Sequence, residues 1–174
     1  KPYPPGQHGQ SRRRKASDYA LALAEKQKMR FYYGLMEKQF KGVYEKSIRR
    51  RGVTGEIMLQ ILETRLDSVV YSLGFGYTRA QSRQMVTHGH VLVNGKRACT
   101  PSIALQEGDT VEIKTVEKSR HLADKNLEYS TSRVVPEWLT LDKASYKGTV
   151  TRLPTRDDIE PVANEQTIVE FYSR

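Results

Sequence analysis

The sequence predicts an α+β fold, and three features lead to this prediction. A helical run opens at Ser17, a residue type that favours the N-cap position. Further along, a two-residue Asn94-Gly95 step separates two short β-prone stretches, which is the pattern of a tight hairpin. Between these features, apolar residues recur at the spacing of one helix face, at Leu62, Leu66, Val69, Val70 and Leu73. With 174 residues the chain can bury one ordinary core or two small ones.

The first half is predicted to be helical after an extended start. Residues 1–16 are rich in proline, glycine and arginine, and they cannot bury a core of their own. The capped helix runs over 17–33, and a second helix fits 35–46. The periodic stretch 54–73 predicts one long helix, or two helices with a bend near Thr64.

A compact helix-and-hairpin unit is predicted to follow. Thr78 is a suitable N-cap, and Gln81 stands where it completes a capping box. Gly89 is suited to ending that helix in a left-handed conformation. Strands at 90–93 and 96–99 then flank the hairpin turn.

The remaining chain gives weaker signals. Residues 110–114 alternate in polarity like a further strand. Residues 115–149 are predicted to be irregular, with Trp138 and Leu139 as their apolar anchor. Residues 168–172 alternate like a terminal strand.

Composition argues against a membrane span and against a metal site. The longest apolar run, 19–24, has six residues, whereas a spanning helix needs about 18 or more. The single cysteine, Cys99, excludes an internal disulfide and a thiolate-rich metal site, and it suits a reducing compartment. The histidines His88 and His90 have no further ligand nearby in the sequence, so we expect no zinc and no other cofactor.

The positive charge is concentrated at the front of the chain. Residues 1–66 hold 15 basic and 6 acidic residues, which accounts for the whole formal net charge of +9. Such a block indicates a polyanionic ligand, although a solvated basic surface is the alternative. Arginine dominates the runs at 12–15 and 49–51, and aromatic residues follow the cations at 26–30. Polar groups surround the helix at 25–28, so RNA or DNA is favoured over an anionic membrane.

A second group of cations falls in the compact unit. Arg79 and Arg83 are four residues apart and therefore share a helix face. The cations at 96–97 follow the hairpin turn, and we expect them near the end of that helix, beside His88 and His90. A rigid basic concavity of this kind reads the shape and phosphates of folded RNA. The alternative is a solvated helix face with unrelated strand charges.

Catalytic motifs are weak. The chain has no Walker-type phosphate loop, no nucleophile elbow and no HExxH sequence. Glu63 and Asp67 lie four apart on the polar face of a helix, where a solvated pair is the ordinary outcome. The triplet at 65–67, Arg-Leu-Asp, resembles the motif around the catalytic aspartate of pseudouridine synthases, but no room remains for their large catalytic domain. We therefore expect a protein that is not an enzyme.

Longer stretches resemble a known family. The segment RLDSVVYSLGFGYTRAQSRQMVTHGHVLVNGKRACTPS, at 65–102, is similar to the RNA-binding module of the small ribosomal subunit protein four family in its bacterial or organellar form. The module alone also occurs in other RNA-binding proteins. The flanks at 4–10, 17–34 and 164–174 resemble the ribosomal family specifically.

The resemblance implies a structural ribosomal protein and a primary binder of 16S ribosomal RNA. Such a protein nucleates assembly of the body of the small subunit. It also implies contact with small-subunit protein five, a contribution to translational accuracy, and a position near the mRNA entry path. The expected location is the cytoplasmic ribosome, with an organellar ribosome not excluded. The alternatives are an RNA-modifying enzyme of the pseudouridine synthase kind and a stand-alone stress factor that binds ribosomes.

The family also implies an arrangement of domains. An extended basic segment covers 1–16, and a helical domain is built from 17–62 plus 148–174. The RNA-binding module and an irregular segment, 63–147, are inserted into it.

Two sets of contact residues follow from the charge pattern and the resemblance together. The cationic and polar set is assigned to ribosomal RNA: Gln7, His8, Arg12, Arg13, Arg14, Lys15, Lys26, Lys28, Arg30, Arg49, Arg50, Arg51, Arg79, Arg83, His88, His90, Asn94, Lys96 and Arg97. The set from the acidic tail is assigned to protein contacts: Asp157, Asp158, Glu160, Glu170 and Tyr172.

Overall fold

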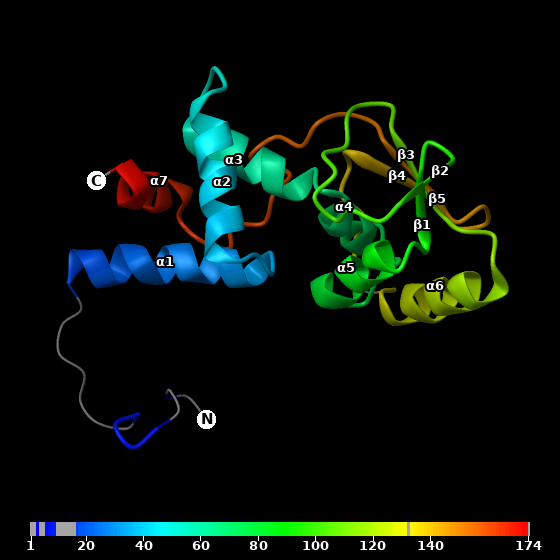
Figure 1. Cartoon of the computed structure of the whole chain (residues 1–174), viewed down its shortest axis with the longest axis horizontal. Coiled ribbons are helices and arrows are strands. Elements are labelled where there is room, and N and C mark those ends of the chain that lie inside the picture. Colours follow the sequence, from blue (N-terminus) through cyan, green and yellow to red (C-terminus); the bar gives the residue numbers. More distant parts are fainter. Residues whose placement is uncertain (1–2, 4–5, 10–16, 132, 174) are drawn as a thin grey trace.

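The computed structural model describes residues 3, 6–9, 17–131 and 133–173. Within them the chain forms seven α-helices and one five-stranded antiparallel sheet, which confirms the predicted α+β class. Figure 1 shows two lobes side by side, one made of helices alone and the other containing the sheet. We refer to them as the helical lobe and the sheet lobe.

The helical lobe consists of α1 (Asp18–Tyr32), α2 (Glu37–Ile48), α3 (Thr54–Glu63) and α7 (Glu165–Ser173). The hydroxyl of Ser17 accepts a hydrogen bond from the backbone of α1, which confirms the predicted cap. Gly34 has a φ of +63°, a conformation that glycine adopts without strain, and it ends that helix as expected. Apolar side chains from the four helices form one core, in which the most buried are Met29, Phe40, Met58, Leu62 and Ile168.

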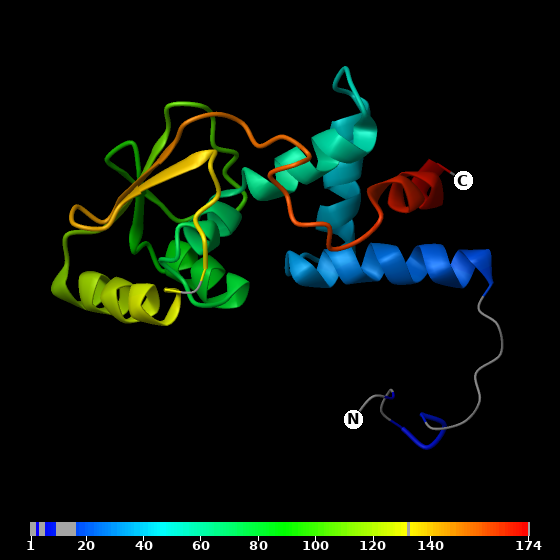
Figure 2. The same cartoon turned by 180° about the vertical axis from the view of Figure 1, so that it is seen from behind.

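The sheet lobe holds all the strands together with three helices. Its elements are α4 (Leu66–Ser72), α5 (Arg79–Thr87), β1 (Val91–Val93), β2 (Lys96–Ala98), β3 (Thr110–Ile113), α6 (Glu117–Tyr129), β4 (Leu139–Asp142) and β5 (Lys147–Val150). The strand order is β2-β1-β3-β5-β4, and the three helices lie along the sheet (Figures 1 and 2). A separate core fills the space between them, with Trp138, Phe75 and Leu73 fully enclosed.

The local turn chemistry agrees with the sequence prediction. Thr78 caps α5 by accepting a hydrogen bond from the Gln81 backbone, and Gly89 follows the helix with a φ of +73°. The Gln81 side chain accepts from the Tyr77 backbone instead of the Thr78 backbone, so the expected capping box is not formed. The hairpin turn is made by Asn94 and Gly95, which have φ values of +50° and +75°. Positive φ at both turn residues matches the right-handed twist of the two strands.

The long periodic stretch forms two helices, α3 and α4. Arg65 is extended and caps α4, and the break is held by the loop that follows β2. The Leu66 backbone donates to the carbonyl of Ile103, and the Leu105 backbone donates to the carbonyl of Thr64. These pairings replace helical hydrogen bonds at the bend, so the two-helix alternative is confirmed.

Three predictions for the second half need correction. Residues 168–172 lie in α7 instead of a strand, because Asn164 accepts a hydrogen bond from the Thr167 backbone and Ile168 is buried in the helical core. Residues 115–149 contain α6 and two paired strands, so they are not irregular. The boundary expected at 148 falls inside β5, whose residues pair with β3 and β4 up to Val150.

Candidate nucleic-acid interface

A groove about 410 Å³ in volume runs between α2 and the sheet lobe. We call it the basic groove. Among its described lining residues there is no carboxylate, and five of them are cations: Lys38, Lys46, Arg50, Arg65 and Arg83. A second hollow, about 430 Å³, adjoins it and shares Arg50, Thr64 and Ala104 with it. Cations that outnumber the acidic groups around a concave surface attract and hold an anionic ligand.

Helix α2 supplies one wall of the basic groove because of its residue spacing. Lys38, Gly42 and Lys46 lie at four-residue intervals and therefore share one face of the helix. Gly42 has no side chain and leaves open space between the two lysines. This wall therefore presents two charges on either side of a gap.

The opposite wall is arranged by the buried carboxylate of Asp67. It accepts two hydrogen bonds from Arg65, at 2.9 and 2.7 Å, and one from Nη1 of Arg83 at 3.1 Å. Arg65 is nearly enclosed, whereas the Arg83 side chain is 38% exposed. Two guanidinium groups share one carboxylate, so a net positive charge remains, and the exposed part of Arg83 can reach a ligand.

A second basic surface lies at the end of α5 and is made of His88, His90, Arg97 and Lys114; we call it the histidine cluster. The Arg97 guanidinium lies over Gly89, where a Cβ atom would collide with it. The rings of His88 and His90 are 6.2 Å apart between centroids. Burial lowers the pKa of His90 below its ordinary value, and the nearby charges of His88, Lys114 and Arg97 lower it further.

The described residues provide neither a cluster of metal ligands nor a membrane-spanning helix. Among the described residues, no three His, Cys, Asp or Glu side chains come close enough together to hold a metal ion. No helix within the described ranges has the length and apolar character needed to cross a membrane.

Comparison with known proteins identifies the family. Residues 1–63 match the model of the ribosomal protein S4/S9 N-terminal domain, and residues 64–111 match that of the S4 domain. The small ribosomal subunit protein uS4 of Opitutus terrae is 55% identical over 172 residues, which cover 99% of this chain and 85% of that protein. The chain belongs to the uS4 family. It is therefore a ribosomal protein of the small subunit and not an enzyme.

Other uS4 proteins match over a similar extent. The protein from Thermus thermophilus is 51% identical, with 100% of this chain and 83% of that protein covered. The protein from Geotalea daltonii is 52% identical, with 99% of this chain and 82% of that protein covered. The contacts of Asp67 agree with membership of a family without enzymatic activity. Its carboxylate is held by two arginines and is not free to act as a catalytic group.

Two cations that the sequence assigned to RNA line the basic groove, and three others are exposed on the helical lobe. Arg50 and Arg83 both line the groove, although they lie 33 positions apart in the sequence. Arg49 and Arg51 are exposed in the α2–α3 loop beside Arg50. Lys28 is exposed on α1, 3.9 Å from Glu25.

The hairpin residues that the sequence assigned to RNA divide between the histidine cluster and the turn. Arg97 does pack back on the end of α5, next to His88 and His90, as expected. Lys96 and Asn94 are exposed in the hairpin. The amide of Asn94, however, donates to Asp109 at 2.8 Å and accepts from the Thr110 backbone at 2.9 Å, so it serves the fold of the turn.

Three cations of this uS4 chain are engaged inside the protein, against the sequence prediction. The Lys26 ammonium is buried 2.7 Å from Glu37 and lies over the Phe171 ring. Arg30 donates to Gln27 and stacks on Phe31. Arg79 is enclosed at the junction of the lobes and pairs with Glu63, although it lines one hollow together with Arg83. Aromatic rings and carboxylates from distant segments surround Lys26 and Arg79, and the local sequence gave no sign of them.

The N-terminal contacts are placed only in part. Gln7 and His8 are exposed in a turn closed by a hydrogen bond from the Gly9 backbone to the Gly6 carbonyl. The run Arg12, Arg13, Arg14 and Lys15 lies outside the described residues.

Of the five residues assigned to protein contacts, three are exposed and two bond within the protein. Asp157, Glu160 and Glu170 are exposed, and Glu160 accepts a hydrogen bond from the Tyr32 hydroxyl at 3.2 Å. Asp158 is instead bound by Arg152 and Thr155, and Tyr172 donates to Glu37 at 2.7 Å while stacking on Tyr44. Those two residues stabilise the fold.

Sequence reasoning missed four cations: Lys38, Lys46, Arg65 and Lys114. The four-residue spacing of Lys38, Gly42 and Lys46 was a signal that could have found the first two. Lys114 follows β3 and reaches the histidine cluster only because its backbone pairs with His90.

Proposed function

We propose that this chain is a structural RNA-binding protein that holds 16S ribosomal RNA in the basic groove and nucleates assembly of the small-subunit body. The observation that carries the proposal is the groove itself, in which five cations and no carboxylate line a concave surface among the described residues. Because the chain belongs to the uS4 family, we take folded ribosomal RNA as the polyanionic ligand of the groove.

The groove binds through phosphates and shape. Arg50 and Arg83 present planar forks that match phosphate oxygens, while Lys38 and Lys46 act as point charges. Folded RNA exposes its phosphates and 2′-hydroxyls more readily than base edges, so the fit of the two lobes to an RNA junction supplies the discrimination. The histidine cluster, on the sheet lobe, contacts a further RNA segment.

Finer assignments rest on the family resemblance. The exposed carboxylates Asp157, Glu160 and Glu170 form the surface we assign to small-subunit protein five, and through it to translational accuracy. The position near the mRNA entry path and the cytoplasmic ribosome as location belong to the same proposal. So does the division into a helical domain and an inserted RNA-binding module, which the two separate cores support.

The test is the salt dependence of binding to naked 16S ribosomal RNA, measured by filter binding. Each phosphate that a cation neutralises contributes a slope of about −0.7 to −0.9 to the plot of log affinity against log salt. The four groove cations other than the enclosed Arg65 therefore predict a slope of about −3 from the groove alone. A flat plot would overturn the proposal. Footprints on one RNA junction, rather than along the whole RNA, are the expected companion result.

A further inference from the structure

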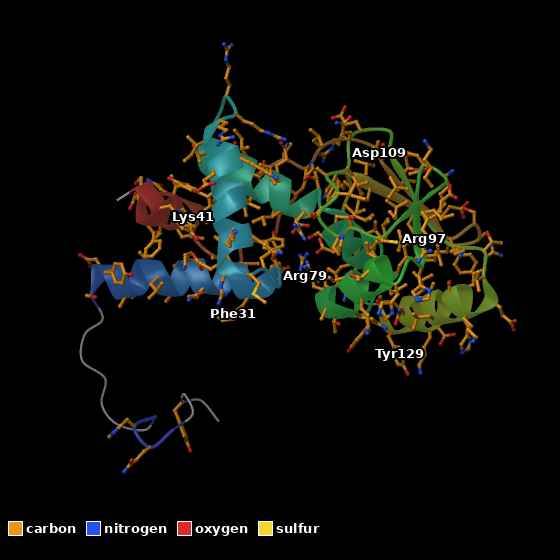
Figure 3. All side chains as sticks on the ribbon, viewed as in Figure 1. Phe31, Lys41, Arg79, Arg97, Asp109 and Tyr129 are labelled. Carbon is orange, nitrogen blue, oxygen red and sulfur yellow. The ribbon has the colours of Figure 1, made fainter. Side chains whose placement is uncertain are left out.

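Arg79 lies at the junction between the two lobes and contacts both of them (Figure 3). It begins α5 of the sheet lobe, yet its guanidinium lies over the rings of Tyr32 and Tyr33 at the end of α1, with Cζ 4.4 and 4.6 Å from their centroids. The Tyr71 ring on α4 lies 4.7 Å away. Three rings therefore enclose one charge, and the Arg79 side chain is only 14% exposed.

Hydrogen bonds complete the connection. Nη2 of Arg79 donates to Oε1 of Glu63, at 3.2 Å, and the Tyr33 hydroxyl donates to the same oxygen at 2.7 Å. Nη1 donates to the Ser68 hydroxyl at 3.1 Å. Cation–π contacts and charge-assisted hydrogen bonds are stronger when they are shielded from water. We call the six residues that take part the Arg79 joint: Tyr32, Tyr33, Glu63, Ser68, Tyr71 and Arg79.

Two hollows that open to solvent flank the joint. One hollow of about 180 Å³ lies beside Phe31 and Ala80, another of about 240 Å³ lies beside Trp138 and Ile159, and Arg79 lines both. In the described chain the cores of the two lobes share no residue. Because no apolar core continues from one lobe to the other and solvent lies beside the joint, apolar contact contributes little to the angle between the lobes.

We propose that the Arg79 joint fixes the angle between the two lobes and so sets the spacing between the walls of the basic groove. Lys38, Lys46 and Arg50 belong to the helical lobe, whereas Arg83 belongs to the sheet lobe, one helical turn from Arg79. Arg79 is thus a positioning residue for phosphate binding. The consequence for RNA rests on the proposed function, whereas the mechanical role does not.

The mechanical role is tested in the free protein with two spin labels, one on the exposed Cys99 and one on a Lys41→Cys variant. These positions lie on the sheet lobe and on α2, so the distance between the labels reports the angle between the lobes. We expect one narrow distribution for the parent and a broad one for Arg79→Met. The isosteric Glu63→Gln should broaden it less, and Arg83→Met, on the same helix, should leave it unchanged.

The consequence for binding is tested with 16S ribosomal RNA. If about a tenth of the Arg79→Met molecules keep the competent angle, the apparent Kd rises about tenfold. The salt slope should stay at the parent value, because no phosphate contact is lost. Arg83→Met should weaken binding and also reduce the magnitude of the slope by about 0.7 to 0.9.

The outcomes separate the two proposals. A narrow, parent-like distribution in both Arg79→Met and Glu63→Gln overturns the joint, and so does a salt slope that falls in Arg79→Met as it does in Arg83→Met. Circular dichroism and a cooperative urea transition establish that each variant is folded before its distances are read. If the parent fails to bind the RNA at all, the proposed function is wrong, while the distance measurement still decides the role of Arg79.

Discussion

The Arg79 joint and the basic groove are neighbouring regions lined by arginine, but they differ in what surrounds the charge. In the joint, one guanidinium meets a carboxylate and three aromatic rings. In the groove, five cations line the hollow, and Arg65 and Arg83 share the buried Asp67 carboxylate behind its wall. Arg79 and Arg83 belong to opposite regions although one helical turn separates them. The supply of acidic and aromatic partners, rather than the residue type, decides whether a cation stabilises the fold or remains available to a ligand.

The largest expected effect comes from removing cationic side chains of the basic groove. Replacing Lys46, Arg50 and Arg83 together with alanine should weaken binding to 16S ribosomal RNA by about 10²–10³-fold, since each charge-assisted contact contributes about 1 kcal/mol or more. The magnitude of the salt slope should fall by about 2–3. Filter binding over a salt series measures both quantities.

The matched control removes three exposed lysines away from the groove: Lys118, Lys125 and Lys143. The control carries the same change in net charge, so a similar loss of affinity would show that the whole protein's charge matters and the groove does not.

The next effect concerns an internal cation. Lys26→Met removes an ammonium that is buried against Glu37 and lies over Phe171 and Tyr172. We expect a loss of about 1–3 kcal/mol in the free energy of unfolding, because a shielded ion pair and cation–π contacts disappear. Urea denaturation measures it, and RNA affinity should stay within twofold of the parent. A large loss of affinity in a variant of normal stability would instead place Lys26 among the RNA contacts.

Acid should lower the stability of the fold through the ion pair between Glu37 and Lys26. Partial burial raises the pKa of Glu37, but hydrogen bonds from Lys26 and Tyr172 outweigh it, so the pKa lies below its ordinary value of 4.5. The unfolded chain then binds the proton first, and this contribution to stability is present above pH 4.5 and lost as the pH falls through the folded value. Glu37→Gln should therefore flatten the decline in the urea midpoint between about pH 5 and 3. An unchanged decline would contradict this.

The smallest effect belongs to the histidine cluster. His90 is neutral at pH 7 because burial and the nearby cations lower its pKa, so it adds no charge there. Because its pKa is lowered, His90 gains a proton only at a pH below the ordinary histidine value of 6.5, and RNA affinity should then rise by about two- to threefold. His90→Gln should remove this rise when binding is measured at constant salt between pH 7 and 5.5. A rise that persists in the variant would show that His90 is not the group that titrates.

Local signals predicted much of the fold. The caps at Ser17 and Thr78 and the Asn94-Gly95 turn depend on hydrogen bonds within a few residues, so the sequence carries the information directly. Helix α6 was missed because its buried face is made of Ser119, Ala123 and Asn126, which an apolar pattern does not detect. In α7, the Asn164 cap was the stronger signal, and the apparent alternation was misleading.

The site could be predicted only in part, for a different reason. The sequence places cations along the chain but does not say which of them meet carboxylates from distant segments. Arg79 pairs with Glu63, 16 residues away, and stacks on Tyr32, far earlier in the chain. The break between α3 and α4 turns these side chains toward one another, so the fold had to be known before Arg79 could be removed from the RNA set.

The insertion of the sheet lobe between α3 and α7 also has a consequence for synthesis on the ribosome. The sheet lobe can close its core once Val150 has emerged, because all of its strands have then been made. Helices α1 to α3 emerge earlier, yet Ile168, which completes their core, comes after the entire sheet lobe. At translation rates of about 5–20 residues per second, Phe40 and Met58 stay without their final covering for several seconds. The N-terminal part of the nascent chain therefore exposes an apolar surface to chaperones during that interval.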